Sequence, residues 1–129
     1  MQDAPEYEDV GHDVEVYLAQ RRDAAVARGI ARDRILLDPG FGFGKTLDQN
    51  VALFRAMPAM IERLGCPFLV GVSRKSMLGQ ITGRPVDARM PASIAAAVLA
   101  AQAGAAVIRV HDVAQTVDAL KVWRMLRPG

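Results

Sequence analysis

Three short apolar runs, separated by longer segments with helical periodicity, constrain the fold of this chain more than any other feature. They lie at residues 35–37, 68–72 and 106–110, and ionisable side chains follow each of them. Near-continuous apolar strands that alternate with helices are typical of a parallel sheet covered by helices. We therefore predict an α/β fold whose strands deliver polar side chains to one edge of the sheet. The periodicity alone does not separate a barrel from an open sheet.

The segments around these runs predict helices, several of them ended by glycine. The expected helices span residues 8–28, 49–64, 77–81, 93–103 and 113–126. The fourth is almost uniformly small and apolar, so it should pack closely against the sheet. On the first helix the expected buried positions are Val10, Val14, Tyr17, Leu18, Ala24 and Ala25. On the last helix they are Val117, Leu120, Val122, Trp123 and Leu126.

Composition predicts a soluble, cytoplasmic protein. Of the 129 residues, 51% are hydrophobic and 23% are charged, which is ordinary for a globular domain. The net charge of +2 is too small to predict a nucleic-acid or membrane partner. No apolar stretch reaches the roughly 18 residues of a membrane-spanning helix. Cys66 is the single cysteine, which excludes an internal disulfide and fits a reducing compartment.

The length of the chain conflicts with a closed barrel. Three parallel strands would leave both outer strands with unpaired backbone groups. A complete eight-stranded barrel needs about 250 residues. We therefore expect the chain to be one part of a larger parallel-sheet domain.

A glycine-rich loop, residues 38–46, follows the first apolar run. It is not a P-loop, because Pro39 occupies the first glycine position, and its alternating glycines do not follow the G-x-G-x-x-G pattern. Such glycines let the backbone turn sharply beside a flat ligand, with Phe41 and Phe43 projecting in consistent directions. Asp38, at the strand end, is placed to accept hydrogen bonds from a donor-rich heterocycle. The other interpretation is that Asp38 only satisfies loop amides in an Asp-Pro-Gly turn.

The other two loops carry basic side chains. Residues 73–76 leave the second run and open a helix, where hydroxyls, backbone amides and the Lys75 ammonium suit a carboxylate, a phosphate or a heterocycle. A plain helix cap is the alternative. Arg109 and His111 alternate along the third run, so they point the same way and suit a phosphate leaving group. A lone histidine is more often structural, but the matched arginine favours a function.

Together these motifs resemble dihydropteroate synthases. Residues 38–46, 70–76 and 108–112 carry the resemblance, and residues 1–10 resemble the segment after the fifth barrel strand of that family. The resemblance implies a partial (β/α)8 TIM barrel, with residues 1–129 as the C-terminal part of a pterin-binding domain. It also implies condensation of 6-hydroxymethyl-7,8-dihydropterin diphosphate with 4-aminobenzoate, giving 7,8-dihydropteroate and diphosphate.

The resemblance assigns roles to residues in these motifs. Asp38 and Lys75 would hydrogen-bond the pterin ring, with Phe43 and Arg109 in the same pocket. Arg109 and His111 would bind the diphosphate and stabilise its departure, which makes them the expected catalytic residues. No residue need act as a covalent nucleophile.

Three further implications concern the second substrate, the metal and the oligomer. Phe43 and Ser76 would flank the aminobenzoate, for which sulfonamide drugs compete. Mg²⁺ would take its ligand from the missing N-terminal half, with no metal ligand in this chain. A homodimer would form through the helices at 93–103 and 113–126. Because the family's other half supplies mobile loops and further pterin-binding groups, we expect no turnover by the chain alone.

Two alternatives stay open. The pterin-binding domain of a corrinoid-linked methyltransferase shares the barrel and the pterin recognition. Methyl transfer expels no diphosphate, however, so the Arg109–His111 pair and residues 73–76 favour the synthase. The second alternative is a truncated, non-catalytic product that acts only as an assembly partner.

Overall fold

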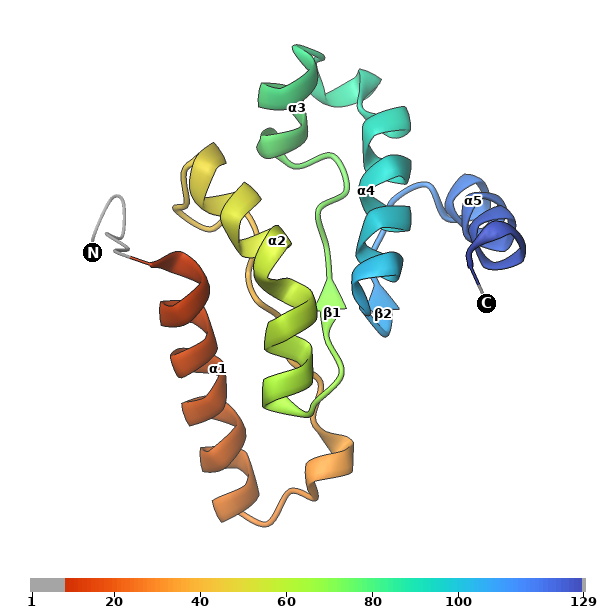
Figure 1. Cartoon of the computed structure of the whole chain (residues 1–129). Coiled ribbons are helices and arrows are strands. Elements are labelled where there is room, and N and C mark those ends of the chain that lie inside the picture. Colours follow the sequence, from red (N-terminus) through yellow and green to blue (C-terminus); the bar gives the residue numbers. More distant parts are fainter. Residues whose placement is uncertain (1–8, 129) are drawn as a thin grey trace.

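The structure is a computed structural model that describes residues 9–128. Helices and short strands alternate along this part of the chain (Figure 1). In order they are α1 (Val10–Ala27), η1 (Arg32–Arg34), α2 (Leu47–Leu64), β1 (Leu69–Val70), α3 (Ser76–Thr82), η2 (Val86–Ala88), α4 (Met90–Ala103), β2 (Val107–Ile108) and α5 (Val113–Leu126). All five predicted helices are present, although the expected start of the first, at residue 8, lies outside the described residues.

The sheet is parallel, as predicted, but its regular pairing is short. β1 pairs with β2, with Leu69 opposite Val107, and the N–H of Arg109 adds one further bond to β1. On the other side of β1, Leu37 forms an isolated parallel bridge with Phe68. The first apolar run, β1 and β2 therefore lie side by side in that order. Three neighbouring parallel segments with helices between them are the arrangement of part of a barrel wall.

Helix α2 provides the largest share of the core. Thr46 and Gln49 form a capping box at its start, which explains why the helix begins two residues before the predicted position. Gly65 ends it in the left-handed conformation. Its buried residues are Asn50, Leu53, Met57, Met60 and Leu64. This face packs against β1 and against α1, whose Val10 and Val14 are buried.

Helix α4 begins three residues before the predicted start, with Pro91 in its first turn. Ser93, Ala96, Ala97 and Ala100 are buried on it. These small side chains let the helix pack closely, which confirms the prediction for this segment. Within residues 9–128, no helix combines the length and the apolar character needed to cross a membrane.

The burial predicted for α1 is partly wrong. Leu18 is buried as expected, but Tyr17 is 60% exposed and Ala24 is also exposed. The buried face is narrower than the sequence pattern suggested, because α1 packs mainly on α2 and leaves its other flank open.

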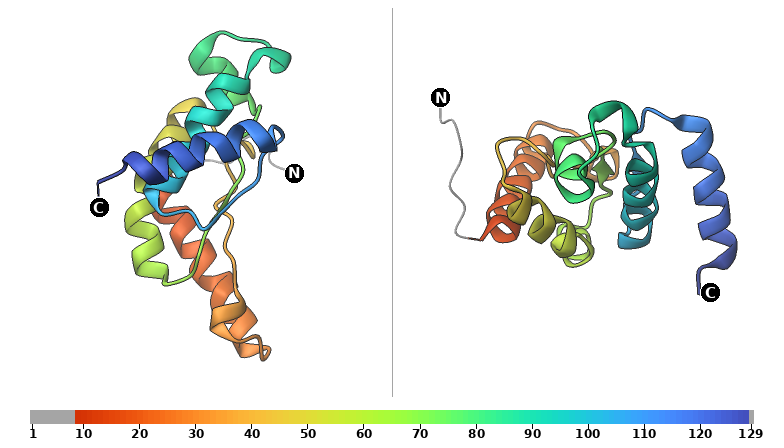
Figure 2. Two further views of the ribbon diagram at one scale, coloured as in Figure 1. Left: turned by 90° about the vertical axis from the view of Figure 1, so that its right-hand side faces the viewer. Right: turned by 90° about the horizontal axis from the view of Figure 1, so that it is seen from above.

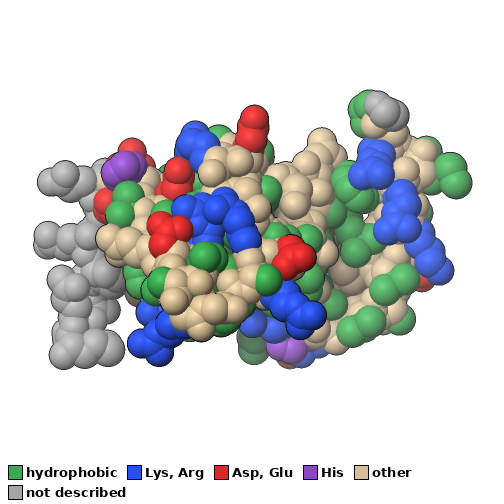
Figure 3. Space-filling model, turned by 90° about the horizontal axis from the view of Figure 1, so that it is seen from below, with side chains coloured by type: hydrophobic (Ala, Val, Ile, Leu, Met, Phe, Trp, Pro, Cys, Tyr) green, Lys and Arg blue, Asp and Glu red, His purple; other side chains and the backbone are tan. Residues whose placement is uncertain are grey.

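The burial predicted for α5 is wrong to a larger extent. This helix packs chiefly on α4 and stands at the edge of the molecule, away from α1 and α2 (Figure 2). Of the expected buried residues, Val117, Val122 and Leu126 are exposed, and Leu120 and Trp123 are half-buried. Thr116 is its buried residue. Hydrophobic and basic side chains therefore alternate on its surface, on the right of Figure 3.

Candidate active site

The glycine-rich loop turns back at the end of the first apolar run. Asp38 Oδ1 accepts a hydrogen bond from the N–H of Gly40 at 2.9 Å, so the local turn considered for this residue is present. Gly40, Gly42 and Gly44 have φ values of 76°, 92° and 69°, which glycine adopts without strain. Asp38 nevertheless remains exposed, and a carboxylate accepts several hydrogen bonds. The turn and a ligand contact are therefore compatible.

The two phenylalanines of this loop do not project alike, contrary to the prediction. Phe41 is 1% exposed and packs on Phe54, with ring centroids 5.6 Å apart, whereas Phe43 is 69% exposed. The buried Asn50 also anchors the loop, because its Oδ1 accepts the Gly42 N–H at 2.9 Å. The sequence interpretation missed Asn50. A polar residue on the apolar face of a helix is the signal that could have found it.

Lys75 connects the glycine-rich loop to the loop after β1. Its Nζ donates to the Phe41 carbonyl at 2.6 Å and lies 5.0 Å from the centroid of the Phe43 ring. Burial lowers the pKa of Lys75, the Arg109 cation lowers it further, and the Asp38 carboxylate acts in the opposite direction. Lys75 thus lies between the acidic and basic ends of the candidate site.

Lys45 is a second lysine of this region that the sequence interpretation did not select. Its Nζ donates to the Gly40 carbonyl at 2.6 Å. Burial lowers the pKa of Lys45, and the nearby Asp38 raises it by a smaller amount. Together with Asp38, Phe43 and Tyr17 of α1, it lines a pocket of about 430 Å³. The sequence signal for Lys45 was the Gly-Lys-Thr triplet at the end of the loop, which still needed an explanation after a P-loop had been excluded.

The residues that follow β1 and β2 converge as predicted. Lys75, Arg109 and His111 line one pocket of about 110 Å³. The Arg109 guanidinium lies against Gly71, where an added Cβ would come within 2.6 Å of Nη2. His111 is fixed by Ser73, whose Oγ lies 2.8 Å from the imidazole Nδ1. Two cations and a protonatable imidazole therefore face one small space, which suits a polyanion.

Ser76 lies apart from these pockets. It is exposed at the first position of α3 and lines neither of the two. The simple helix-cap interpretation of residues 73–76 is wrong, because no side chain caps α3 and Ser73 contacts His111 instead.

A resident metal ion does not fit the described residues. Between residues 9 and 128, no group of three or more His, Cys, Asp and Glu side chains could hold one. The side chains that converge on the smaller pocket are basic instead, and they would repel a divalent cation.

The chain belongs to the pterin-binding enzyme family, because the model of that family, described as "Pterin binding enzyme", matches residues 1–111. Curated relatives are dihydropteroate synthases. The chain is 50% identical to that of Neisseria meningitidis serogroup C over 127 residues, which is 98% of this chain and 45% of the relative. It is 46% identical to that of Escherichia coli over 122 residues, 95% of this chain and 43% of the relative.

Solved structures give the same result. Dihydropteroate synthase from Xanthomonas albilineans in complex with 7,8-dihydropteroate superimposes with a TM-score of 0.93 at 48% identity, covering 100% of this chain and 49% of that one. The same enzyme with 4-aminobenzoic acid gives a TM-score of 0.93 at 49% identity, covering 98% and 46%. The fold is therefore part of a dihydropteroate synthase barrel, as predicted, and the chain spans just under half the length of these relatives.

Proposed function

We propose that this chain forms part of the active site of a dihydropteroate synthase, which joins 6-hydroxymethyl-7,8-dihydropterin diphosphate to 4-aminobenzoate. The observation that carries the proposal is the convergence of Lys75, Arg109 and His111 on one pocket, with Lys75 also against the Phe43 ring. The similar structures support it, because they were solved with 7,8-dihydropteroate and with 4-aminobenzoic acid.

In this proposal the pterin ring binds between Asp38 and Lys75. The exposed Asp38 carboxylate accepts hydrogen bonds from the amino and ring N–H groups of the pterin, and Lys75 donates to its acceptor atoms. The exposed Phe43 ring and the Arg109 guanidinium provide flat surfaces beside it. To donate to the pterin, Lys75 must either break its hydrogen bond to the Phe41 carbonyl or use its remaining N–H groups.

The diphosphate binds at Arg109 and His111 and leaves before the arylamine attacks. Negative charge grows on the diphosphate as its bond to the pterin methylene lengthens, and fixed cations aimed at that charge lower the barrier. Lys75 adds a second cation beside Arg109, and its pKa is lowered chiefly by burial and further by the Arg109 cation. No covalent intermediate with the protein is required.

The 4-aminobenzoate binds beside the pterin methylene. Phe43 and Ser76 flank it in this proposal, supported by the exposure of both side chains near the Lys75 loop. Inhibitors of the sulfonamide class compete for the same position. A similar synthase, from Yersinia pestis, has been solved in a sulfonamide drug complex, at 43% identity and a TM-score of 0.91.

Magnesium does not fit the described residues. We propose that its ligands, together with the remaining pterin-binding groups, come from outside residues 1–129, which then form the C-terminal part of the barrel domain. The proposed location is the cytoplasm, where the lone Cys66 stays reduced.

A homodimer through α4 and α5 is the proposed assembly. Leu99 of α4 is 57% exposed and Val122 of α5 is 58% exposed, so both helices carry apolar surface that a second copy would bury. Sedimentation at several protein concentrations tests this assembly. A species that remains monomeric would contradict it.

The test of the proposed function is dihydropteroate formation from the pterin diphosphate and 4-aminobenzoate in the presence of magnesium. The chain is assayed alone and joined to the part of the Neisseria meningitidis relative that it does not match. We expect no product from the chain alone and product from the joined protein. Arg109→Gln should lower kcat by about 10²-fold, the size of effect found when an oxyanion-stabilising donor is removed.

The control is Arg124→Gln, which removes an exposed arginine on α5 and should leave the rate unchanged. A folded joined protein that forms no dihydropteroate would contradict the proposal. A methyl-transfer activity in its place would favour the corrinoid-linked alternative. Tight association of the chain with a full-length synthase, without catalysis, would favour the assembly-partner alternative.

A further inference from the structure

The loop between β1 and α3 has an unusual backbone at Arg74. Its φ is 59°, the only positive value at a non-glycine residue among residues 9–128. Side chains other than glycine, asparagine and aspartate rarely adopt this conformation, and it persists where surrounding contacts impose it. Arg74 immediately precedes Lys75, so its backbone sets the direction in which Lys75 enters the pocket.

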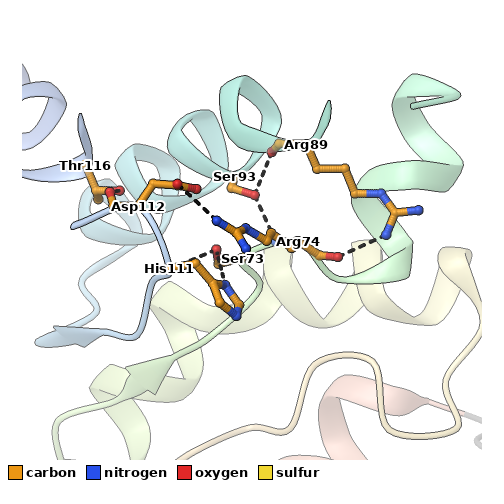
Figure 4. A network of polar contacts seen from close by, with 7 residues as sticks. All are labelled: Ser73, Arg74, Arg89, Ser93, His111, Asp112 and Thr116. Carbon is orange, nitrogen blue, oxygen red and sulfur yellow. Dashed lines mark hydrogen bonds and ion pairs between the residues drawn. The ribbon is translucent and has the colours of Figure 1, made fainter. Parts of the chain in front are cut away.

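Three contacts hold Arg74 in this conformation (Figure 4). Its backbone N–H donates to Ser93 Oγ at 2.9 Å, and its carbonyl accepts from Arg89 Nη1 at 3.0 Å. Its own Nη2 donates to Asp112 Oδ1 at 3.1 Å. We call Arg74, Arg89, Ser93 and Asp112 the Arg74 clamp. It joins the loop after β1, the start of α4 and the loop after β2.

The two residues from the start of α4 are themselves fixed. Ser93 is 5% exposed, and its hydroxyl donates to the Arg89 carbonyl at 2.7 Å. Arg89 also donates from Nε to the Arg84 carbonyl at 3.0 Å, and its guanidinium lies directly against Gly79. The side of the clamp that contacts the Arg74 backbone is therefore held by hydrogen bonds of its own.

Asp112 holds the other side. It occupies the N-cap position of α5, yet its side chain caps no backbone N–H and instead binds Arg74. Its backbone carbonyl accepts from the Thr116 hydroxyl at 2.7 Å, which fixes the residue at the start of the helix. Its Oδ2 is buried and has no partner among the described residues. The carboxylate therefore depends on Arg74 for its compensation.

Neither Arg74 nor Asp112 lines the basic pocket, but each is next in sequence to a residue that does. Arg74 precedes Lys75 and Asp112 follows His111. The pocket itself brings like charges together, so without an anion its two walls repel each other. The ion pair between Arg74 and Asp112 opposes that repulsion from outside the pocket.

We propose that Arg74 and Asp112 are positioning residues, whose ion pair holds the loop of Lys75 against the loop of His111 and so sets the geometry of the diphosphate pocket. The identity of the bound group rests on the proposed function. The side chains of Arg74 and Asp112 are 42% and 19% exposed, so Asp112→Asn, which removes the carboxylate charge together with the ion pair, should cost little stability. Loss of the pair should therefore change ligand binding far more than folding.

The experiment compares Asp112→Asn with Glu15→Gln. Glu15 forms an ion pair of the same chemistry with Arg63, at 2.6 Å, between α1 and α2 and away from the site. Three quantities are measured: hydrogen exchange of the 73–77 amides in the chain, the Ki of inorganic diphosphate, and the kcat and KM of the joined protein. For Asp112→Asn we expect faster exchange and a rise of about ten-fold or more in Ki and in KM for the pterin diphosphate.

Glu15→Gln should change none of these quantities, and both variants should keep the thermal midpoint of the wild type within a few degrees. In exchange, Ki and KM, Arg74→Gln should reproduce Asp112→Asn, and the double variant should be no worse than either single one, because one interaction is lost in all three.

Unchanged exchange in Asp112→Asn overturns the proposal whether or not the protein is active. Faster exchange with unchanged Ki and KM overturns it as well, because the clamp would then be merely structural. If the wild type forms no dihydropteroate, the proposed function fails by itself. The positioning role is then decided by the exchange and by the affinity for inorganic diphosphate.

Discussion

Helices α2 and α5 both carry apolar residues at helical spacing, but these gather on one face less clearly on α5, and the two helices have very different surroundings in the structure. α2 buries Leu53, Met57 and Met60 completely and carries both a capping box and a glycine stop. α5 buries Thr116 and leaves Val122 and most of its other apolar residues exposed. Apolar residues at helical spacing therefore lead to a core helix in one region and to a lightly packed helix in the other.

This difference extends to the two walls of the candidate site. The glycine-rich loop is held by packing, through Phe41 against α2 and the buried Asn50. Arg109 and His111 follow β2, beside the lightly packed α5, and polar contacts such as that between Ser73 and His111 hold this wall instead. One wall should therefore respond to core substitutions, and the other to the loss of hydrogen bonds and ion pairs.

The largest expected effect is on stability, at the buried Leu53 of α2. Leu53→Ala should lower the free energy of unfolding of the chain by about 2–5 kcal/mol, because Leu53 is fully buried and a cavity would remain. Val122→Ala, its counterpart on α5, should change the free energy of unfolding of the monomer by less than about 0.5 kcal/mol. Urea denaturation of both variants measures the difference. Equal losses would show that α5 is as well packed in solution as α2.

A second prediction compares two amide side chains. Asn50→Ala leaves the partly buried Gly42 N–H without its acceptor and should cost about 1–3 kcal/mol. Gln102→Ala removes the acceptor for Trp123 Nε1 between α4 and α5, where the residue is exposed, and should cost less than about 1 kcal/mol. Denaturation again provides the measurement. A larger cost for Gln102→Ala would contradict the conclusion that the α4–α5 contact is the weaker of the two.

A third prediction concerns the polar wall. Gly71→Ala places a methyl group where the Arg109 guanidinium lies, and a flexible side chain will move rather than unfold the sheet. We expect stability within about 1 kcal/mol of the wild type and a loss of about ten-fold in kcat/KM of the joined protein. Steady-state kinetics check this. Unchanged kinetics would mean that the position of Arg109 does not matter for the reaction.

The smallest expected effect is electrostatic. Asp38→Asn removes the carboxylate that raises the pKa of Lys75 and of Lys45, so both pKa values should fall further below that of an ordinary lysine. Arg109→Gln should raise the pKa of Lys75, since the arginine lowers it. Anion binding requires protonated Lys75 and weakens as the pH rises through its pKa, so Asp38→Asn should move this loss to lower pH. NMR titration of the lysine side chains tests both directions, and shifts of the opposite sign would contradict the geometry.

Sequence patterns were sufficient for the elements and for the polar strand ends, because helical periodicity, glycine stops and apolar runs are local properties. The convergence of Lys75, Arg109 and His111 could also be predicted, since the carboxyl ends of parallel strands meet at one edge. The exposure of α5 could not, because an apolar stripe shows that a helix can be buried but not which surface covers it.

The partners of individual side chains also could not be predicted from the sequence. Ser93 and Asp112 lie 19 and 38 residues from Arg74, and nothing in their local pattern marks them as its partners. The opposite directions of Phe41 and Phe43 depend on Phe54, which lies on a different element. Such contacts arise only when the loops are packed together.

The most direct test of the account is a titration of the joined protein with inorganic diphosphate, following the side-chain NMR signals of His111 and Lys75. If these residues form the diphosphate pocket, both signals should shift with the same dissociation constant, and Arg109→Gln should weaken binding. Diphosphate that binds or inhibits without moving either signal would place the leaving-group site elsewhere and contradict the account.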